Sequence, residues 1–247
     1  MHYPRNALPE AIYHVMSRGN RKQDIFLSSL DREIFIHLVE TAVTDFSWKC
    51  HSYCIMTNHY HLLIETTTGG LSDGMHMINS GYSGAFNKRY QKNGHVFQGR
   101  FRSRLIKDDA DFLTVVRYMA LNPVKAGLAV DPVGWKWSSY GALAGNRSNA
   151  GFLDVDLVRS FFASPGNDGN DGYRAFIAER IPDALAGNLG HLPTLIELFA
   201  SCTDAESKKC SMSEAHFDFG YTMSDIADFL GVSCSAVSRA IKSFHSR

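Results

Sequence analysis

The chain has 247 residues, of which 45% are hydrophobic and 20% are charged, and its 25 Lys and Arg residues balance its 25 Asp and Glu residues. This composition predicts one large domain and a smaller one, and argues against a disordered or fibrous protein. No apolar run approaches about 18 residues and no charged-then-apolar leader is visible, so we expect a cytoplasmic protein without membrane contact. The five scattered cysteines are expected to be free thiols. Zinc binding by Cys50 and Cys54 is disfavoured, because four strand residues separate their side chains by roughly 13 Å.

The balanced total hides an asymmetry along the chain. Residues 1–130 contain 15 basic and 11 acidic side chains, whereas residues 131–247 contain 10 basic and 14 acidic ones. The first part therefore has a net charge of about +4 and the second of about −4. Neither value is extreme, so local clusters of charge say more about partners than the total does.

Hydrophobic periodicity and turn signals divide the first half of the chain into strands and helices. Strands are expected at residues 11–18, 48–55, 59–66 and 96–107, and helices at residues 30–46, 71–90 and 109–121. This order predicts an α+β fold, a ferredoxin-like antiparallel sheet with helices on one face. We expect this domain to span residues 1–140. A linker with short helices is expected at residues 141–182, and a small all-α domain at residues 183–247.

Two histidines stand one residue apart in the expected strand at residues 59–66. A strand places alternate side chains on one face, so His59 and His61 should project side by side, with Tyr60 on the other face. Neutral imidazole is the commonest metal ligand in proteins. The pair therefore indicates half of a metal site, although two histidines on a polar strand face without a ligand role would give the same pattern.

A basic segment occupies residues 88–107 and contains no acidic residue. Its basic side chains are Lys88, Arg89, Lys92, Arg100, Arg102, Arg104 and Lys107. In a strand, Arg100, Arg102 and Arg104 would form a row on one face, which suits phosphate groups. Aromatic side chains beside such a row suit unpaired bases. The segment predicts nucleic-acid binding, and the alternative is a solvated charged face, which would normally carry both signs.

The expected helix at residues 109–121, whose end is marked by Asn122 and Pro123, supplies a candidate nucleophile. A metal site beside a phosphate-binding strand suggests phosphoryl transfer, which needs an attacking group. Tyr118 and Asn122 lie four residues apart and share one helix face. A phenolic oxygen can attack a phosphodiester, and an amide oxygen can complete a ligand set with two histidines. Spacing alone also allows Tyr118 to be a residue at the edge of the core and Asn122 to be a residue that ends the helix. Tyr82 or Tyr90 would then be the alternative nucleophile.

Four ordered motifs resemble those of a known family. They lie at residues 13–20, 56–64, 94–101 and 118–127. The His-Tyr-His sequence in the second motif resembles the histidine–hydrophobic–histidine (HUH) signature of the single-tyrosine transposases. The set as a whole resembles the REP-associated tyrosine transposases, over about residues 11–140. Tyr60 departs from the plain apolar residue that is usual in the middle of the signature, and a buried tyrosine needs a partner for its hydroxyl.

The resemblance implies a ferredoxin-like catalytic domain with Tyr118 as the nucleophile and His59, His61 and Asn122 as ligands of Mg²⁺ or Mn²⁺. It implies an endonuclease and strand transferase that acts on single-stranded, hairpin-forming DNA of the REP type through a 5′-phosphotyrosine, in DNA transposition. The expected DNA contacts in this domain are Arg18, Lys88, Arg89, Lys92, Gln98, Arg100, Arg102 and Arg104. Such a protein could be a monomer or a homodimer, with Tyr118 serving its own histidine pair or a partner's.

The C-terminal tail has the pattern of a helix-turn-helix. Helices are expected at residues 222–230, capped by Thr222, and at residues 233–244. The expected shared core is Ile226, Leu230, Val232, Val237 and Ile241. The polar side of the second helix carries Ser235, Arg239 and Lys242, which could contact duplex DNA. The alternative for the tail is a small interaction bundle, and the alternative for the whole chain is a catalytically silent DNA-binding regulator that keeps the fold.

Overall fold

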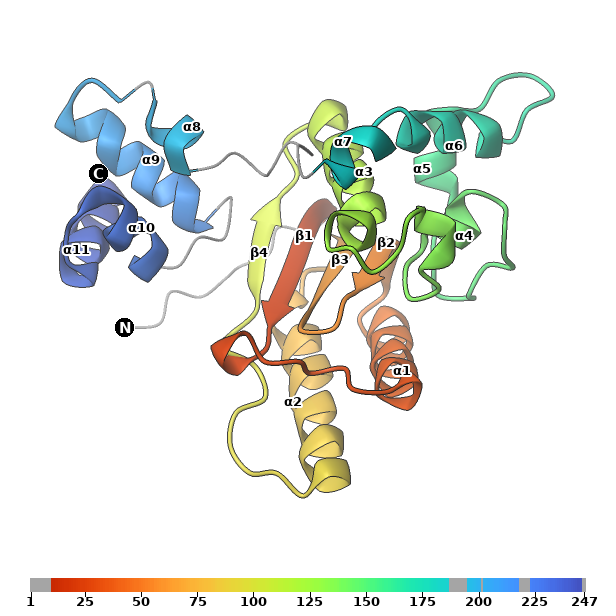
Figure 1. The fold of residues 1–247 in the computed structure, drawn as a ribbon, viewed down its shortest axis with the longest axis horizontal. Coiled ribbons are helices and arrows are strands. Elements are labelled where there is room, and N and C mark those ends of the chain that lie inside the picture. The colour runs from red at the N-terminus through yellow and green to blue at the C-terminus, as the bar shows by residue number, and fades with distance from the viewer. Residues whose placement is uncertain (1–9, 187–194, 201, 218–222, 246–247) are drawn as a thin grey trace. The chain divides into compact units, whose positions relative to one another are not determined.

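The computed structural model describes residues 10–186, 195–200, 202–217 and 223–245. The chain forms two compact units, one of residues 1–101 and 105–189 and one of residues 102–104 and 190–247. Figure 1 shows the elements in chain order. The three long strands and the helices that cover them belong to the first unit.

A four-stranded antiparallel sheet has the strand order β2-β3-β1-β4 (Figure 1). Its strands are β1 (Ala11–Arg18), β2 (Trp48–Ile55), β3 (His59–Thr66) and β4 (Arg102–Leu105). In the β1–β3 ladder, Arg18 lies opposite His59 and Met16 lies opposite His61. Because β3 pairs with a strand on each side, the two histidines lie on a central strand whose backbone is held by both neighbours.

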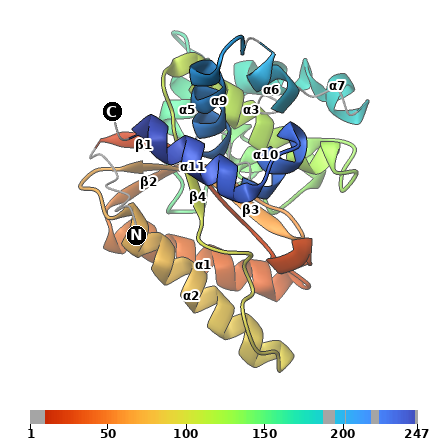
Figure 2. The same cartoon turned by 90° about the vertical axis from the view of Figure 1, so that its left-hand side faces the viewer.

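Three helices of the first unit cover the sheet: α1 (Ser29–Asp45), α2 (Leu71–Tyr90) and α3 (Asp109–Lys125). Figure 2 shows α1 and α2 side by side. Tyr60 of β3 contacts Phe35 of α1 and Asn79 of α2. The next residue, His61, contacts Tyr118 of α3. Since neighbouring strand residues face opposite ways, α3 covers the face opposite to α1 and α2.

The expectation of helices on one face therefore holds for α1 and α2 but is wrong for α3. Both faces of β3 are apolar, since Leu62 and Leu63 are each buried although they point in opposite directions. Helix periodicity shows that a helix has an apolar side. It does not show which face of a two-sided sheet that side will cover.

The expected strand at residues 96–107 is much shorter in the structure, where β4 covers only Arg102–Leu105. Gly94 adopts a positive φ of 93°, and residues 94–101 run past the end of β1. There the Asn20 amide donates to the Val96 carbonyl and the Gln98 amide to the Arg18 carbonyl, each at 2.8 Å. The expected row of three arginines on one strand face is therefore wrong: Arg100 precedes the strand, and Arg104 is buried.

Helix α3 continues to Lys125, beyond the expected end at residue 121. Pro123 lies inside the helix and cannot donate a backbone hydrogen bond. The helix nevertheless goes on, because the Ala126 amide donates to the Asn122 carbonyl at 3.0 Å and Val124 is buried in the core. Tyr118 and Asn122 consequently lie on one regular helix.

The segment at residues 141–182, expected as a linker with short helices, is part of the first unit. Its helices are α4 (Tyr140–Leu143), α5 (Asp156–Ser160), α6 (Asn170–Ala178) and α7 (Ile181–Leu185), and the short 3-10 helices η1 (Asn20–Lys22) and η2 (Pro132–Gly134) precede them. Val158 and Ile177 are fully buried in the same core as Phe112 of α3. Phe161 also stacks on Phe112, with the ring centroids 5.5 Å apart. Apolar contacts therefore join this segment to α3.

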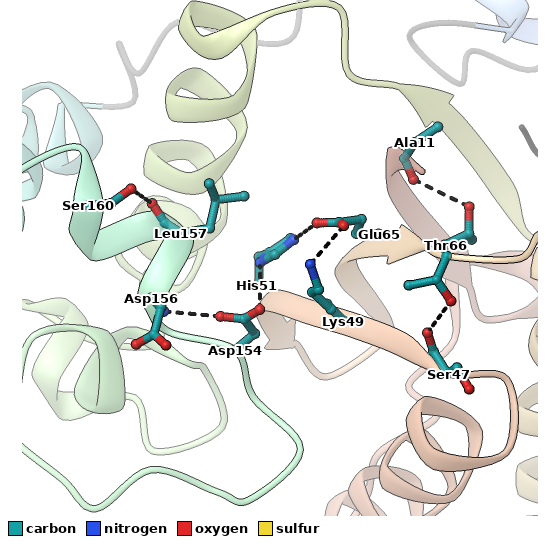
Figure 3. A network of polar contacts seen from close by, with 11 residues as sticks. Ala11, Ser47, Lys49, His51, Glu65, Thr66, Asp154, Asp156, Leu157 and Ser160 are labelled. Carbon is teal, nitrogen blue, oxygen red and sulfur yellow. Dashed lines mark hydrogen bonds and ion pairs between the residues drawn. The ribbon is translucent and has the colours of Figure 1, made fainter. Parts of the chain in front are cut away.

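A polar network joins the segment after α4 to β2 and β3 (Figure 3). The buried His51 places Nε2 2.8 Å from Glu65 Oε2, and Lys49 Nζ lies 3.0 Å from Glu65 Oε1. The Asp154 amide donates to the Cys50 carbonyl at 2.8 Å. Burial acts to raise the pKa of Glu65, but the hydrogen bonds from Lys49 and His51 outweigh it, so the pKa is lowered. The ionised carboxylate is thus favoured in the folded state.

Glu65→Gln is expected to lower the free energy of unfolding by about 1 kcal/mol at pH 7. A carboxyl whose folded-state pKa is lowered stabilises the protein above its unfolded pKa of about 4.3, and this contribution is lost as the pH falls through the folded value. Urea denaturation of both proteins at several pH values measures the effect. The difference should shrink towards zero in acid, and a difference independent of pH would show that packing, not charge, is responsible.

The second unit contains four described helices, α8 (Leu195–Phe199), α9 (Ala205–Phe217), α10 (Met223–Leu230) and α11 (Cys234–His245). Its core contains Ala215, Ile226, Ala227, Val237 and Ile241. Gly231 turns the chain between α10 and α11 with a φ of 67°, a conformation that glycine adopts without strain. The expected core residues Ile226, Val237 and Ile241 are thus confirmed.

Two sequence-based expectations for the C-terminal tail, at Val232 and Thr222, are not confirmed by the described structure. Val232 is 42% exposed, because it directly follows the turn instead of lying on a helix, so its expected core role is wrong. Thr222, the expected helix cap, lies outside the described residues. The tail core therefore depends on the helical positions alone.

The sequence analysis expected free cysteine thiols and no membrane-spanning segment. All five cysteines are free thiols, and burial raises the pKa of Cys50 to about 12. In the described ranges, no three His, Cys, Asp or Glu side chains are arranged to hold a metal ion. No helix in these ranges is long and apolar enough to cross a membrane.

Candidate active site

The histidine pair projects from the start of β3 towards α3. The rings of His59 and His61 lie with their centroids 5.0 Å apart, as expected for alternate residues of a strand. His59 Nδ1 lies 2.7 Å from Asn58 Oδ1, and since the amide oxygen can only accept, this nitrogen must carry the proton. The Nε2 atom of His59 therefore keeps its lone pair for another partner.

His61 is oriented by a residue that the sequence analysis did not select, His14 of β1. His14 Nε2 lies 2.9 Å from His61 Nδ1, and both side chains are buried. The signal was present in the sequence, because His14 lies two residues before Met16, which faces His61 across the ladder. Predicting the contact between His14 and His61 requires knowledge of the pairing register of two strands that are distant in sequence. The contact gives His61 the same arrangement as His59, with Nδ1 occupied and Nε2 pointing elsewhere.

Helix α3 brings the other two predicted residues to this point. Asn122 Nδ2 lies 3.2 Å from His61 Nε2. The ring of Tyr118, one turn earlier, meets the ring of His61 edge-on, with the centroids 5.4 Å apart. Four residues of helix place both side chains on the side that faces β3. Tyr118, Asn122, His59 and His61 therefore form one cluster, defined here as the β3–α3 site.

The electrostatic setting keeps both imidazoles neutral. Burial, assisted by the charge of Arg18, lowers the pKa of His59 to about 4. Burial also lowers the pKa of His61 well below its ordinary value, assisted by the neighbouring His59 and His14. Both groups are unprotonated at neutral pH, which is the state in which imidazole binds a metal.

The residues of the β3–α3 site fit a divalent cation. Two neutral imidazole nitrogens and one amide oxygen are donors that Mn²⁺ accepts, and Mg²⁺ accepts the oxygen. The Asn122 amide presents nitrogen to His61, but nitrogen and oxygen of an amide exchange places on rotation. His59, His61 and Asn122 are accordingly the residues that would hold the ion.

The other tyrosines considered as nucleophiles are used elsewhere. Tyr90 donates to Asp31 Oδ2 at 2.7 Å, and Tyr82 donates to the Ile25 carbonyl. Both lie on α2, which covers the opposite face of the sheet from α3. Neither hydroxyl is placed with the histidine pair.

Several expected DNA contacts are exposed around the first unit. Arg18 is exposed and lies opposite His59 at the end of β1. Lys88, Arg89 and Lys92 are exposed at the end of α2. Arg89 Nε is 3.5 Å from Asp31 Oδ1 and Lys92 lies over the Phe86 ring, so both also make contacts within the protein. These side chains add positive charge near the α2 terminus.

The remaining expected DNA-contact residues differ in how exposed they are. Gln98 and Arg100 are exposed, whereas Arg102 is half-buried and Arg104 is buried. Ser235 and Arg239 are exposed on α11, and the side chain of Lys242 lies outside the described part of the chain. Burial of Arg104 removes it from the accessible set.

Part of the chain matches the model of a known protein family. Residues 7–122 match the family model described as "Transposase IS200 like". This span includes His59, His61, Tyr118 and Asn122, and it covers the strands β1 to β4. Over this span the chain is similar to the IS200-like transposases.

A more specific likeness is to the REP-associated tyrosine transposases. The chain is 31% identical over 101 residues to a protein of Haemophilus influenzae named as a REP-associated tyrosine transposase, which covers 35% of this chain and 56% of that protein. The chain thus spans little more than half of this curated relative. A solved REP-associated tyrosine transposase bound to a REP hairpin matches with a TM-score of 0.50 at 18% identity, over 63% of this chain and 90% of the other. The resemblance expected from the sequence is confirmed.

Proposed function

We propose that the protein is a metal-dependent single-strand DNA endonuclease and strand transferase that acts on hairpin-forming, REP-like DNA through a 5′-phosphotyrosine, in DNA transposition. One observation carries the proposal: the convergence of Tyr118 and Asn122 from α3 on His61 from β3. A nucleophile beside a neutral donor set is the arrangement that phosphoryl transfer requires.

In the proposed reaction, the Tyr118 hydroxyl gives its proton to water, and its oxygen forms a bond to the scissile phosphorus. The bond from phosphorus to the 3′ oxygen breaks, and the leaving oxygen takes up a proton to become a 3′-hydroxyl. Reversal on another strand, by attack of a 3′-hydroxyl on the phosphotyrosine, rejoins DNA and frees Tyr118. A bound Mg²⁺ or Mn²⁺ would supply stabilisation of the negative charge on the phosphate oxygens.

The chain's own residues position this chemistry. His59, His61 and Asn122 would hold the cation, while Asn58 and His14 fix the imidazole rings by hydrogen bonds to their Nδ1 atoms. Arg18 and the exposed basic side chains of α2 would bind the DNA backbone. A DNA substrate is consistent with the cytoplasmic location expected from the sequence.

The proposal extends to the two parts of the chain, a catalytic domain and a C-terminal DNA-binding region. The β1-α1-β2-β3-α2-β4 order and the sheet order β2-β3-β1-β4 support a ferredoxin-like catalytic domain at residues 1–140. Helices α10 and α11, joined at Gly231, support a helix-turn-helix that contacts duplex DNA through Ser235, Arg239 and Lys242. The protein would act as a monomer or a homodimer, with Tyr118 completing its own site or a partner's.

The proposal is tested with hairpin oligonucleotides carrying a label at either end, incubated with Mn²⁺ or Mg²⁺ and resolved under denaturing conditions. A 5′-phosphotyrosine predicts that the 3′ label migrates with the protein, the 5′ label is released on a shorter strand, and mass spectrometry finds the adduct on Tyr118. Binding without cleavage with either metal would instead favour the catalytically silent regulator.

A further inference from the structure

Arg18, the last residue of β1, lies on the face of the sheet that carries the β3–α3 site. It is directly opposite His59 in the β1–β3 ladder, and the side chains of directly opposite residues project to the same side. His14, four residues earlier on β1, shows which side this is, because its ring centroid lies 5.1 Å from that of His61 and 6.4 Å from that of Tyr118. Arg18 is exposed whereas His59 is half-buried, so the guanidinium lies at the open edge of the site.

The backbone around Arg18 is held on several sides. The Gln98 amide donates to the Arg18 carbonyl and the Gly19 amide donates to the Asn58 carbonyl, each at 2.8 Å. Glycine is required at position 19, because a Cβ atom there would collide with the Gln23 carbonyl oxygen. The start of the Arg18 side chain therefore has a fixed position relative to Asn58 and to the histidine that follows it.

The protein supplies no counter-charge for Arg18. In the described part of the chain, no acidic side chain forms an ion pair with it, whereas Arg117 of α3 lies 3.2 Å from Glu179 Oε2. The charge of Arg18 also acts on the site itself. Burial is the main cause of the lowered pKa of His59 and His61, and Arg18 adds to the lowering of both. The group that would balance this charge is an anion from outside the protein.

The donors that would hold a cation are also uncharged. They are two imidazoles and one amide, and within residues 10–186 no acidic side chain joins the histidines to complete a metal-binding group of three. A bound cation and Arg18 would therefore be two positive centres that repel each other. A phosphodiester carries one negative charge on two non-bridging oxygens, so it can contact both centres at once. Guanidinium is well suited to such a contact, because its forked donors match phosphate oxygens.

We propose that Arg18 is a catalytic residue that binds a non-bridging oxygen of the scissile phosphate, in contrast to the side chains that contact the DNA backbone elsewhere. The inference rests on the proposed function and adds a second positive centre to its site. As Tyr118 attacks, negative charge on the non-bridging oxygens increases, and a guanidinium at this position stabilises it. Arg18 only donates hydrogen bonds in this step and exchanges no proton, since guanidinium stays protonated in proteins.

The first test measures Mn²⁺ binding to the full-length protein without DNA, by electron paramagnetic resonance. Arg18→Gln should bind Mn²⁺ about threefold more tightly than wild type at low ionic strength, because the repelling charge is gone, and high salt should remove the difference. Tighter binding also shows that the variant is folded. Arg100→Gln is the matched control, because it removes the same charge from an exposed arginine that lines a cavity of about 670 Å³ beside α2, and it should leave the Mn²⁺ affinity unchanged.

The second test measures cleavage of the end-labelled hairpin. Arg18→Gln should lower kcat by about a hundredfold and change KM by less than about threefold, because a contact to the scissile phosphate acts on the transition state. A contact to any other phosphate affects KM and not kcat, and Arg100→Gln should show this second pattern. Arg18→Lys keeps the charge but not the forked donors, so it should recover part of kcat and keep the wild-type Mn²⁺ affinity.

The third test replaces one non-bridging oxygen of the scissile phosphate by sulfur, in each of the two diastereomers. Wild type should cleave one diastereomer about tenfold more slowly than the oxygen substrate, because sulfur weakens the hydrogen bond from Arg18. Arg18→Gln should cleave that diastereomer and the oxygen substrate at similar rates, since the contact is already absent.

The outcomes separate this inference from the proposed function. Wild-type cleavage with an unchanged kcat in Arg18→Gln, or with the same sulfur effects in both proteins, would overturn the role of Arg18 and leave the proposed function standing. Unchanged or weaker Mn²⁺ binding in Arg18→Gln would also overturn it. A wild-type protein that binds hairpins but cleaves none with either metal would overturn the proposed function, and the role of Arg18 with it.

Discussion

Replacing Tyr118 by phenylalanine is expected to abolish the covalent adduct and to lower the rate of strand cleavage by at least about a thousandfold. Phenylalanine keeps the ring that meets His61 edge-on but has no oxygen to attack phosphorus. Cleavage is measured with the end-labelled hairpin, and hairpin and Mn²⁺ affinities are measured alongside it. Both affinities should stay within about threefold of wild type, since neither depends on the nucleophile.

Tyr90→Phe provides the matched control, because the Tyr90 hydroxyl donates to Asp31 and is not part of the β3–α3 site. This variant should still form the adduct, even if it loses some stability. An adduct that persists in Tyr118→Phe would exclude Tyr118 as the nucleophile. Adduct lost from both variants would indicate a general effect on the fold.

Replacing His14 by leucine is expected to weaken Mn²⁺ binding by about 10- to 100-fold. Leucine fills a similar space in the buried position but cannot accept the proton of His61 Nδ1, so the His61 ring loses the contact that directs Nε2 towards Asn122. His14→Gln retains an oxygen that can accept this hydrogen bond and should recover most of the affinity. Titration of Mn²⁺ followed by electron paramagnetic resonance, without DNA, gives the affinity independently of catalysis.

A purely structural role for His14 predicts a different pattern. In that case leucine and glutamine would change the Tm by comparable amounts, and the Mn²⁺ affinity would follow the Tm. Equal affinities in wild type and His14→Leu would show that His14 does not position His61. The Tm of each variant is therefore measured with the titration.

The rival reading, a silent DNA-binding regulator, predicts that hairpin binding survives every substitution in the β3–α3 site and that no metal dependence appears. If the protein is an enzyme, substitutions at Tyr118 and His14 should have different effects on cleavage and on metal binding. The first removes cleavage and keeps metal binding, whereas the second weakens metal binding itself. Two variants with different readouts therefore distinguish the classes.

The sequence by itself was sufficient where function depends on local geometry. The period of two in a strand predicts that His59 and His61 share a face, and the helix repeat predicts that Tyr118 and Asn122 do. The structure agrees with both, because hydrogen bonding within an element determines these directions whatever surrounds it. The order of strands and helices could be predicted from periodicity for the same reason.

Only the tertiary structure decided how distant segments meet. The contact of His14 with His61 depends on the β1–β3 register, and the position of α3 depends on which face of an apolar strand it covers. Residues 94–101 alternate like a strand in part, yet Gly94 and the bonds to Arg18 and Asn20 make them the wall of a cavity. Such contacts are set by packing and pairing between segments far apart in the chain, which no local pattern encodes.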